Sequence, residues 1–144
     1  GRERRRGGRG PEDLALQLLV VIMSTRDGLV IGVDDVATQE FPWGAIKWLC
    51  NDEIDPEAKQ TLGIVFINPG MSNAAHSHPN CEELLYVIEG QCEHGLGEQE
   101  HHLEAGMMIR VPAGVPHSAH NSGWEPVKML VSYSAPDREM VLES

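Results

Sequence analysis

Three histidines and one glutamate in this sequence have the types and spacing of a metal site. His76 and His78 are separated by one residue in a segment that leads toward a strand, so both rings lie on the same face. Glu83 follows five residues after His78, and His117 comes much later, after a Pro-Ala-Gly-Val-Pro turn. Three neutral imidazoles and one carboxylate would bind one divalent transition metal, such as Fe, Mn, Ni, Cu or Zn. They would leave positions for water, substrate or dioxygen, which is typical of a catalytic site.

The other histidines have a simpler interpretation. His94, His101 and His102 flank Gly97-Glu98, a pair that favours a hairpin turn. We therefore expect a solvated hairpin there rather than a second metal site. His120 is offset by an odd number of residues from the candidate ligand on its own segment, so on a strand it would face away from the metal.

Short apolar runs separated by turn residues must position these side chains. The separators include Asn68-Pro69-Gly70 and Pro112-Ala113-Gly114, and no stretch has sustained helical periodicity. Evenly spaced short strands of this kind indicate an all-β sandwich or barrel, with at most one helical turn in 52–60. The runs that we expect to form strands are 29–33, 45–49, 61–67, 84–88, 107–111 and 127–133.

Two motifs carry the candidate ligands and make the chain resemble the cupin superfamily. The first consists of Gly70, His76, His78, Glu83 and Gly90, and the second of Gly106, Pro112, Gly114, His117 and Asn121. Their spacing is similar to that of small single-domain members, the monocupins, and the resemblance covers about residues 60–135. It implies a jelly-roll β-barrel, also called a double-stranded β-helix, that holds a metal inside through His76, His78, Glu83 and His117.

The resemblance also distinguishes between two adjacent glutamates. Glu83, and not Glu82, leaves six residues before Gly90, as the first cupin motif requires. Glu83 is therefore the expected ligand, and Glu82 is expected in solvent or in a salt bridge on the opposite strand face. Alternation from Glu83 directs Leu85 and Val87 inward, which gives the site an apolar wall.

Arg110 is the one candidate for substrate binding besides the metal. In 107–111, Met108 and Arg110 share one strand face, while Ile109 and Val111 share the other. If the Arg110 face lines the barrel, the guanidinium would clamp a carboxylate or enolate oxygen. The alternative places Arg110 on the outer surface beside acidic strands, and the sequence leaves both open.

The charge, the apolar runs and the cysteines limit which partners and which cellular compartment we expect. The formal net charge is -11, but residues 1–10 hold five arginines, so residues 11–144 carry a net charge of -15. An acidic body repels phosphate backbones, so we expect no nucleic-acid partner. The longest apolar run, Leu14 to Met23, is shorter than a bilayer requires, so we expect no membrane partner. Three cysteines without a CxxC pair favour a reducing compartment, and we expect the cytoplasm.

The length is typical of one domain. Residues 1–22, rich in arginine and then apolar, are interpreted as an N-terminal extension that is either non-native or an added strand. Residues 23–144 are expected to form a single cupin domain.

The resemblance also sets the range of functions. We expect a metal-dependent oxidoreductase of the dioxygenase type, acting on a small oxygenated organic substrate, and a homodimer. One alternative is a redox-neutral, metal-dependent isomerase, cyclase, decarboxylase or lyase. Another is a non-catalytic small-molecule-binding cupin. The fold alone does not rank these functions.

Overall fold

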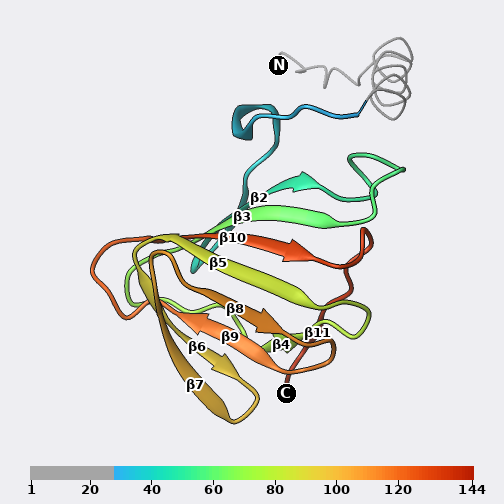
Figure 1. Cartoon of the computed structure of the whole chain (residues 1–144). Coiled ribbons are helices and arrows are strands. Elements are labelled where there is room, and N and C mark those ends of the chain that lie inside the picture. The colour runs from blue at the N-terminus through green and yellow to red at the C-terminus, as the bar shows by residue number, and fades with distance from the viewer. Residues whose placement is uncertain (1–27) are drawn as a thin grey trace, which may run out of the picture. The chain divides into compact units, whose positions relative to one another are not determined.

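Strands build the described part of the chain, which in this computed structural model is residues 28–144 (Figure 1). A 3-10 turn, η1, at Val33–Asp35 precedes them. The strands are β1 Gln39–Phe41, β2 Gly44–Cys50, β3 Thr61–Ile67, β4 His76–Ser77, β5 Glu83–Glu89, β6 Gln91–Leu96, β7 Gln99–Glu104, β8 Met108–Val111, β9 His117–His120, β10 Val127–Tyr133 and β11 Val141–Leu142. Within these residues no helix has the length and apolar character to cross a membrane. The predictions for residues 1–22 lie outside the described residues and remain predictions.

The strands form two antiparallel sheets. One has six strands in the order β1-β2-β3-β10-β5-β8, and the other has five in the order β11-β4-β9-β6-β7. Strands that are distant in the sequence are therefore neighbours, since β10 lies between β3 and β5. The hydrophobic core draws residues from both sheets, such as Val65 and Val131 from the first and Cys92 and Ala119 from the second. The predicted all-β jelly-roll fold is confirmed.

Strand alternation decides which side chains reach the space between the sheets. On β10 every second residue from Val127 to Tyr133 is buried, and on β5 every second residue from Glu83 to Val87 is buried. The predicted inward direction of the β5 face is therefore correct. Tyr86, which points the other way, is 43% exposed. Glu83 thus begins a strand face that is otherwise apolar. It is buried because the apolar residues on the same face pack into the interior.

Two turn residues fix connections close to the ends of the strands. Gly90 has a φ of +85°, and a Cβ atom there would lie 2.8 Å from the carbonyl oxygen of Pro126, so the position requires glycine. Asn121 is fully buried, and its Nδ2 donates to the carbonyl oxygens of Ile67 at 2.9 Å and Glu125 at 2.8 Å. Asn121 therefore ties a turn and stabilises the connection that follows β9.

Five of the six expected strand runs lie in strands, and the sixth does not. The run 29–33 contains no strand, and it leads into η1, where the backbone N–H of Gly32 donates to Asp35 Oδ2 at 2.8 Å. The segment 52–60, where at most one helical turn was expected, contains no helix. That segment forms turns in which Asn51 Oδ1 accepts hydrogen bonds from two following backbone N–H groups, which satisfies them without a helix.

Candidate metal centre

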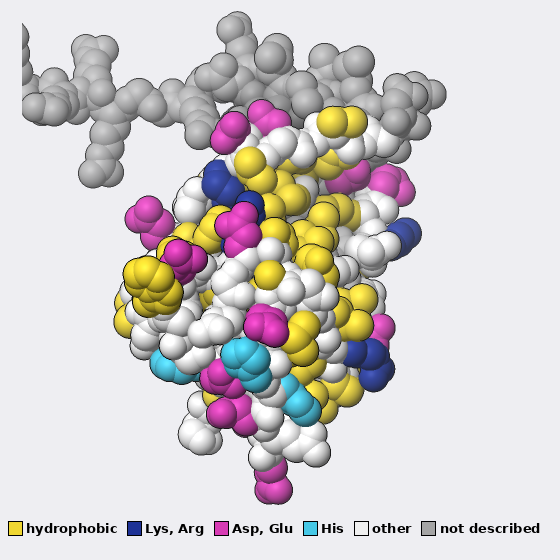
Figure 2. All heavy atoms as spheres, turned by 60° about the vertical axis from the view of Figure 1, so that its left-hand side comes forward, with side chains coloured by type: hydrophobic (Ala, Val, Ile, Leu, Met, Phe, Trp, Pro, Cys, Tyr) yellow, Lys and Arg dark blue, Asp and Glu magenta, His cyan; other side chains and the backbone are white. Residues whose placement is uncertain are grey.

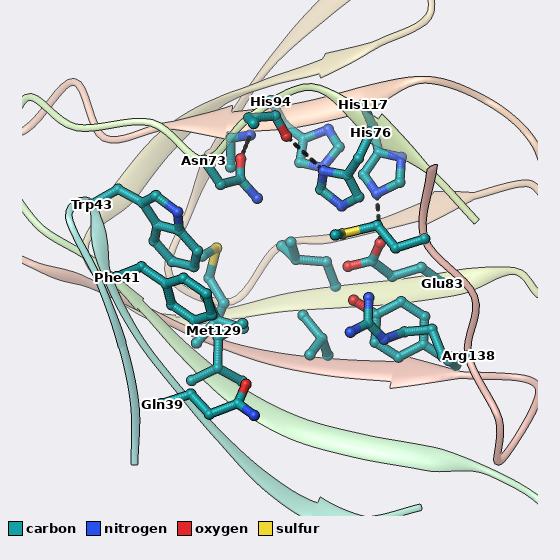
Figure 3. A pocket seen from close by; sticks show the side chains of 18 of the residues that line it. Gln39, Phe41, Trp43, Asn73, His76, Glu83, His94, His117, Met129 and Arg138 are labelled. Carbon is teal, nitrogen blue, oxygen red and sulfur yellow. Dashed lines mark hydrogen bonds and ion pairs between the residues drawn. The ribbon is translucent and has the colours of Figure 1, made fainter. Parts of the chain in front are cut away.

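The four predicted ligands come together in the interior, as Figure 3 shows for three of them. β4 pairs with β9 through His76 and His117, so two histidines that are far apart in the sequence become neighbours. Glu83 approaches from the first residue of β5, in the other sheet. The candidate ligand nitrogens of His76, His78 and His117 lie within 4.8 Å of one another. Glu83 Oε2 lies 2.8 Å from His117 Nε2 and 3.6 Å from His78 Nε2. The structure thus brings all four residues around one point.

Backbone carbonyls orient the three histidine rings. In each ring Nδ1 lies within hydrogen-bond distance of a carbonyl oxygen and donates to it. The acceptors are Ala74 for His76 at 2.7 Å, Glu139 for His78 at 2.8 Å and Val115 for His117 at 2.9 Å. In the neutral form of each ring, this tautomer leaves the lone pair of Nε2 free to face the centre. Carbonyl partners of this kind fix ligand histidines in metal sites.

The centre contains buried polar atoms that have no hydrogen-bond partner outside it. Among the described residues His78 Nε2 has none, and His117 Nε2 and Glu83 Oε2 have each other at 2.8 Å, a hydrogen bond that forms when His117 Nε2 carries a proton. Their side chains are between 2% and 4% exposed. Burying a polar atom without a partner is costly, and a cation bound between these atoms would compensate all of them together. The residues present therefore fit a divalent metal, and the three histidines form a candidate metal site.

Burial and the Glu83 charge set the protonation of the site. Burial lowers the pKa of His78 to about 4, and it also lowers the pKa of His76. Burial acts against protonated His117 as well, but the hydrogen bond and charge of Glu83 raise its pKa above the ordinary value. Burial would raise the pKa of Glu83, yet the neighbouring histidines lower it overall. These shifts favour neutral His76 and His78 and an ionised Glu83, and His117 holds a proton more tightly than an ordinary histidine does.

A cavity of about 380 Å³ opens beside the centre, between the two sheets. Aliphatic side chains such as Val65, Leu85 and Val131 line its wall, and Leu85 was expected there. Phe41 and Trp43 also line it, with stacked rings whose centroids are 4.8 Å apart (Figure 3). Among the described lining residues, Glu83 is the single carboxylate. The cavity is large enough for a small organic molecule and is mostly apolar.

Arg110 does not line this cavity, so its predicted role as a substrate clamp is wrong. Its Nε donates to Glu82 Oε2 at 2.7 Å on the outer surface, where both side chains are exposed. The reason is strand alternation in β8, because the apolar pair Ile109 and Val111 occupies the inward face. The alternative position on the outer surface, with Glu82 in a salt bridge, is the one found.

His94 is a cavity residue that the sequence analysis placed on a solvated hairpin. The hairpin of β6 and β7 exists, and His101 and His102 are exposed on it as expected. His94, however, is 1% exposed, and its ring is parallel to that of His117 with centroids 5.9 Å apart. Its Nδ1 has no partner in the described residues, and burial lowers its pKa to about 4. Cys92 and His94 are two residues apart on β6 and are both buried, so strand alternation from an apolar Cys92 was the signal that could have identified it.

Arg138 and Tyr133 are two further cavity residues that the sequence analysis did not identify. The Arg138 guanidinium lies over the Trp48 ring at 4.6 Å and over the Tyr133 ring at 5.1 Å. Burial, followed by the charge of Glu83, raises the pKa of Tyr133 well above its ordinary value, so this phenol stays protonated. Tyr133 continues the buried alternation of β10, but no sequence pattern marks Arg138, which follows that strand in a polar segment.

Comparison with known proteins agrees with this fold. The Cupin domain family matches residues 63–133. Polyketide synthase CurC of Streptomyces cyaneus is 32% identical over 105 residues, which cover 73% of this chain and 68% of CurC. The formate complex of oxalate decarboxylase from Lactobacillus farciminis has a TM-score of 0.73 at 24% identity, covering 81% of this chain and 37% of the decarboxylase. An uncharacterised Klebsiella pneumoniae protein with a double-stranded β-helix domain has a TM-score of 0.67 at 22% identity, covering 80% of this chain and 96% of that one. The chain therefore belongs to the cupin superfamily.

Proposed function

We propose that this cupin is a metal-dependent enzyme that acts on a small oxygenated organic substrate, with His76, His78, Glu83 and His117 as the metal ligands. The observation that carries the proposal is the group of buried histidine nitrogens and one carboxylate that converge beside the cavity. A bound metal would supply a Lewis acid or a redox centre that polarises or oxidises the substrate. The chain's own residues orient the ligands, exclude water and hold the substrate.

The first candidate reaction is oxidation of the dioxygenase type. The aliphatic wall of Val65, Leu85 and Val131 excludes water, which a reactive metal centre needs. Within the described lining, the single carboxylate is Glu83, which is already assigned to the metal. No second carboxylate therefore stands ready as a general base, and a reaction driven by the metal and dioxygen does not require one.

The second candidate reaction is a redox-neutral conversion such as cyclisation. His94 favours it, because this neutral imidazole lines the cavity and its Nδ1 has no partner in the described residues. A neutral imidazole can accept a proton from a carbon or hydroxyl group of a bound substrate. Similarity to polyketide synthase CurC also supports this candidate, because a polyketide is an organic substrate with several oxygen atoms.

Metal analysis of protein purified without a histidine tag tests the proposal. We expect about one transition metal ion per chain, as a single site requires. The double variant His76→Ala with His117→Ala should lose it. The matched control, His101→Ala with His102→Ala, removes two exposed histidines and should retain the wild-type content. Equal metal content in wild type and in the first double variant would show that the assigned site is wrong.

The identity of the metal and of its open positions separates the two reactions. Iron, nickel or copper in the purified protein would support oxygen chemistry, and zinc would support redox-neutral chemistry. Protein loaded with Fe(II) without oxygen can then be exposed to nitric oxide, a probe for positions open to a diatomic molecule. An electron paramagnetic resonance signal of an iron–nitrosyl centre would support the dioxygenase type, and its absence would count against it.

We also propose that the protein forms a homodimer through the outer face of the six-stranded sheet. Leu84 and Tyr86 of β5 and Met108 of β8 are 40% or more exposed, and Tyr86 is paired with Met108 across the strands. Neighbouring exposed apolar side chains are typical of an association surface. Sedimentation of wild type should give a dimer, and Tyr86→Glu should give a monomer. A monomeric wild type would contradict the proposal.

A further inference from the structure

Arg138 lies at the same end of the cavity as Glu83 (Figure 3). Its guanidinium carbon lies 4.6 Å from the centroid of the Trp48 ring and 5.1 Å from that of the Tyr133 ring, and the two rings are inclined at 58° to each other. A guanidinium held against aromatic rings keeps N–H donors available for other partners. Arg138, which lines the cavity, therefore brings N–H donors to this end of it.

The segment that carries Arg138 is fixed on both sides of it. Asn80 Nδ2 donates to the carbonyl oxygen of Asp137 at 3.0 Å, and Asn80 Oδ1 accepts from the backbone N–H of Glu139 at 2.9 Å. The carbonyl oxygen of Glu139 accepts from His78 Nδ1 at 2.8 Å. The same short segment thus positions both a candidate metal ligand and the guanidinium, so their relative position is held by the backbone.

No carboxylate within the described residues pairs with Arg138 at 4.0 Å or less, and none of their side-chain or backbone oxygens accepts a hydrogen bond from it. The contrast is Arg110, whose guanidinium is engaged by Glu82. An arginine carries five N–H donors and binds carboxylate and enolate oxygens strongly. Arg138 therefore has donors available for an oxygen anion in the cavity.

The charges around the cavity favour the same ligand class. The two positive charges of a divalent metal exceed the single negative charge of Glu83, and Arg138 adds one more positive charge. Elsewhere the surface is acidic, and Figure 2 shows acidic side chains spread over the face in view. A chain with a net charge of -15 over residues 11–144 repels anions at long range, so a local cation is needed to hold one.

The other end of the cavity is aromatic and apolar. The rings of Phe41 and Trp43 are parallel to within 4° and line the cavity together with Met129. A planar ring system packs on such a wall more favourably than a short polar molecule does. With a divalent metal bound, the cavity would be cationic at the end that holds Glu83 and Arg138, and its other end is apolar.

We propose that Arg138 determines substrate specificity, and that the cavity binds a planar, ring-bearing acid. In this arrangement the anionic oxygen, a carboxylate or enolate, lies between Arg138 and the metal centre, and the ring body packs on Phe41 and Trp43. The inference rests on the proposed function in one respect, the metal at the centre. The contact with Arg138 itself does not depend on that metal.

Two probes of the same shape and different charge test this inference. 1-Hydroxy-2-naphthoate carries a carboxylate, and 1-hydroxy-2-naphthamide replaces it by a neutral amide. Isothermal titration calorimetry measures both with zinc-loaded and with metal-free protein. We expect wild type to prefer the acid. In Arg138→Gln the acid should bind about 10- to 100-fold more weakly, since hydrogen bonds to charged groups have that effect, while the amide should change little. Arg138→Lys should give a smaller loss.

A matched control and the metal-free measurement make the outcomes decisive. Arg110→Gln removes an exposed arginine and should leave both affinities unchanged. Circular dichroism and the zinc content of Arg138→Gln establish that the variant is folded and loaded. Equal affinity of wild type for acid and amide, or equal affinity of wild type and Arg138→Gln for the acid, would overturn the inference. If wild type holds no metal, the proposed function is wrong, and the metal-free titration still decides the role of Arg138.

Discussion

The stability of the metal-free protein should depend on pH through His94. This side chain is 1% exposed, and burial lowers its pKa to about 4, against about 6.5 for histidine in an unfolded chain. Between these two values the unfolded chain binds a proton at His94 and the folded chain does not. Titration of His94 therefore does not reduce the free energy of unfolding above about pH 6.5. The free energy of unfolding falls as the pH drops from there toward about 4.

The size of the effect follows from the two pKa values. One unit corresponds to about 1.4 kcal/mol, so the full interval amounts to about 3 kcal/mol, and about 2 kcal/mol of it is lost by pH ~5. His94→Leu removes the titrating group and replaces it by an apolar side chain of similar size. Between pH ~7.5 and pH ~5 the variant should lose about 2 kcal/mol less than wild type.

Urea unfolding of chelator-treated protein at these two pH values, followed by tryptophan fluorescence, measures the difference. The exposed residue His101 provides the control, because His101→Leu should retain the wild-type pH dependence. The reasoning would be refuted by His94→Leu and wild type losing the same free energy on acidification. That result would mean that His94 is not buried in its neutral form.

Three further predictions concern the pH dependence of zinc binding, the packing of the core and the turn at Gly90. Burial opposes protonation of His117, but Glu83 raises its pKa overall. Below that pKa zinc binding should therefore release protons and weaken about tenfold per pH unit, as calorimetry in different buffers measures. In urea unfolding, Leu85→Ala should cost about 2–5 kcal/mol, against less than about 0.5 kcal/mol for the fully exposed Val30→Ala. Gly90→Ala should cost about 1 kcal/mol or more, because φ is +85° and Pro126 is close. Equal costs at Leu85 and Val30, a neutral Gly90→Ala or pH-independent zinc affinity would contradict these expectations.

The longest strands could be predicted because their apolar alternation is a local property of the sequence. β3 and β10 have the bounds expected for the runs 61–67 and 127–133. The short strands β4 and β9 carry His76 and His117 in place of apolar residues, so the pattern that marks a strand is missing where the candidate ligands lie. These two strands exist because tertiary pairing, rather than local preference, holds them.

The candidate site was predictable to the extent that it lies in motifs. The four candidate ligands have motif spacing, whereas the cavity around them depends on which face of each strand is buried. For β8 the sequence defined two strand faces without showing which one is buried. In the structure Ile109 and Val111 occupy the buried face, so Arg110 lies on the exposed one. Arg138 enters the cavity from a polar segment after β10, and its position depends on hydrogen bonds to Asn80 that no sequence pattern shows.

Anomalous diffraction at a metal absorption edge tests the central claim most directly. Crystals of protein purified without a tag would be measured on both sides of the edge of the metal that elemental analysis identifies. The account predicts one anomalous peak, about 2.0–2.2 Å from the Nε2 atoms of His76, His78 and His117 and from a carboxylate oxygen of Glu83. A peak elsewhere in the molecule, or no peak in crystals soaked with that metal, would contradict it.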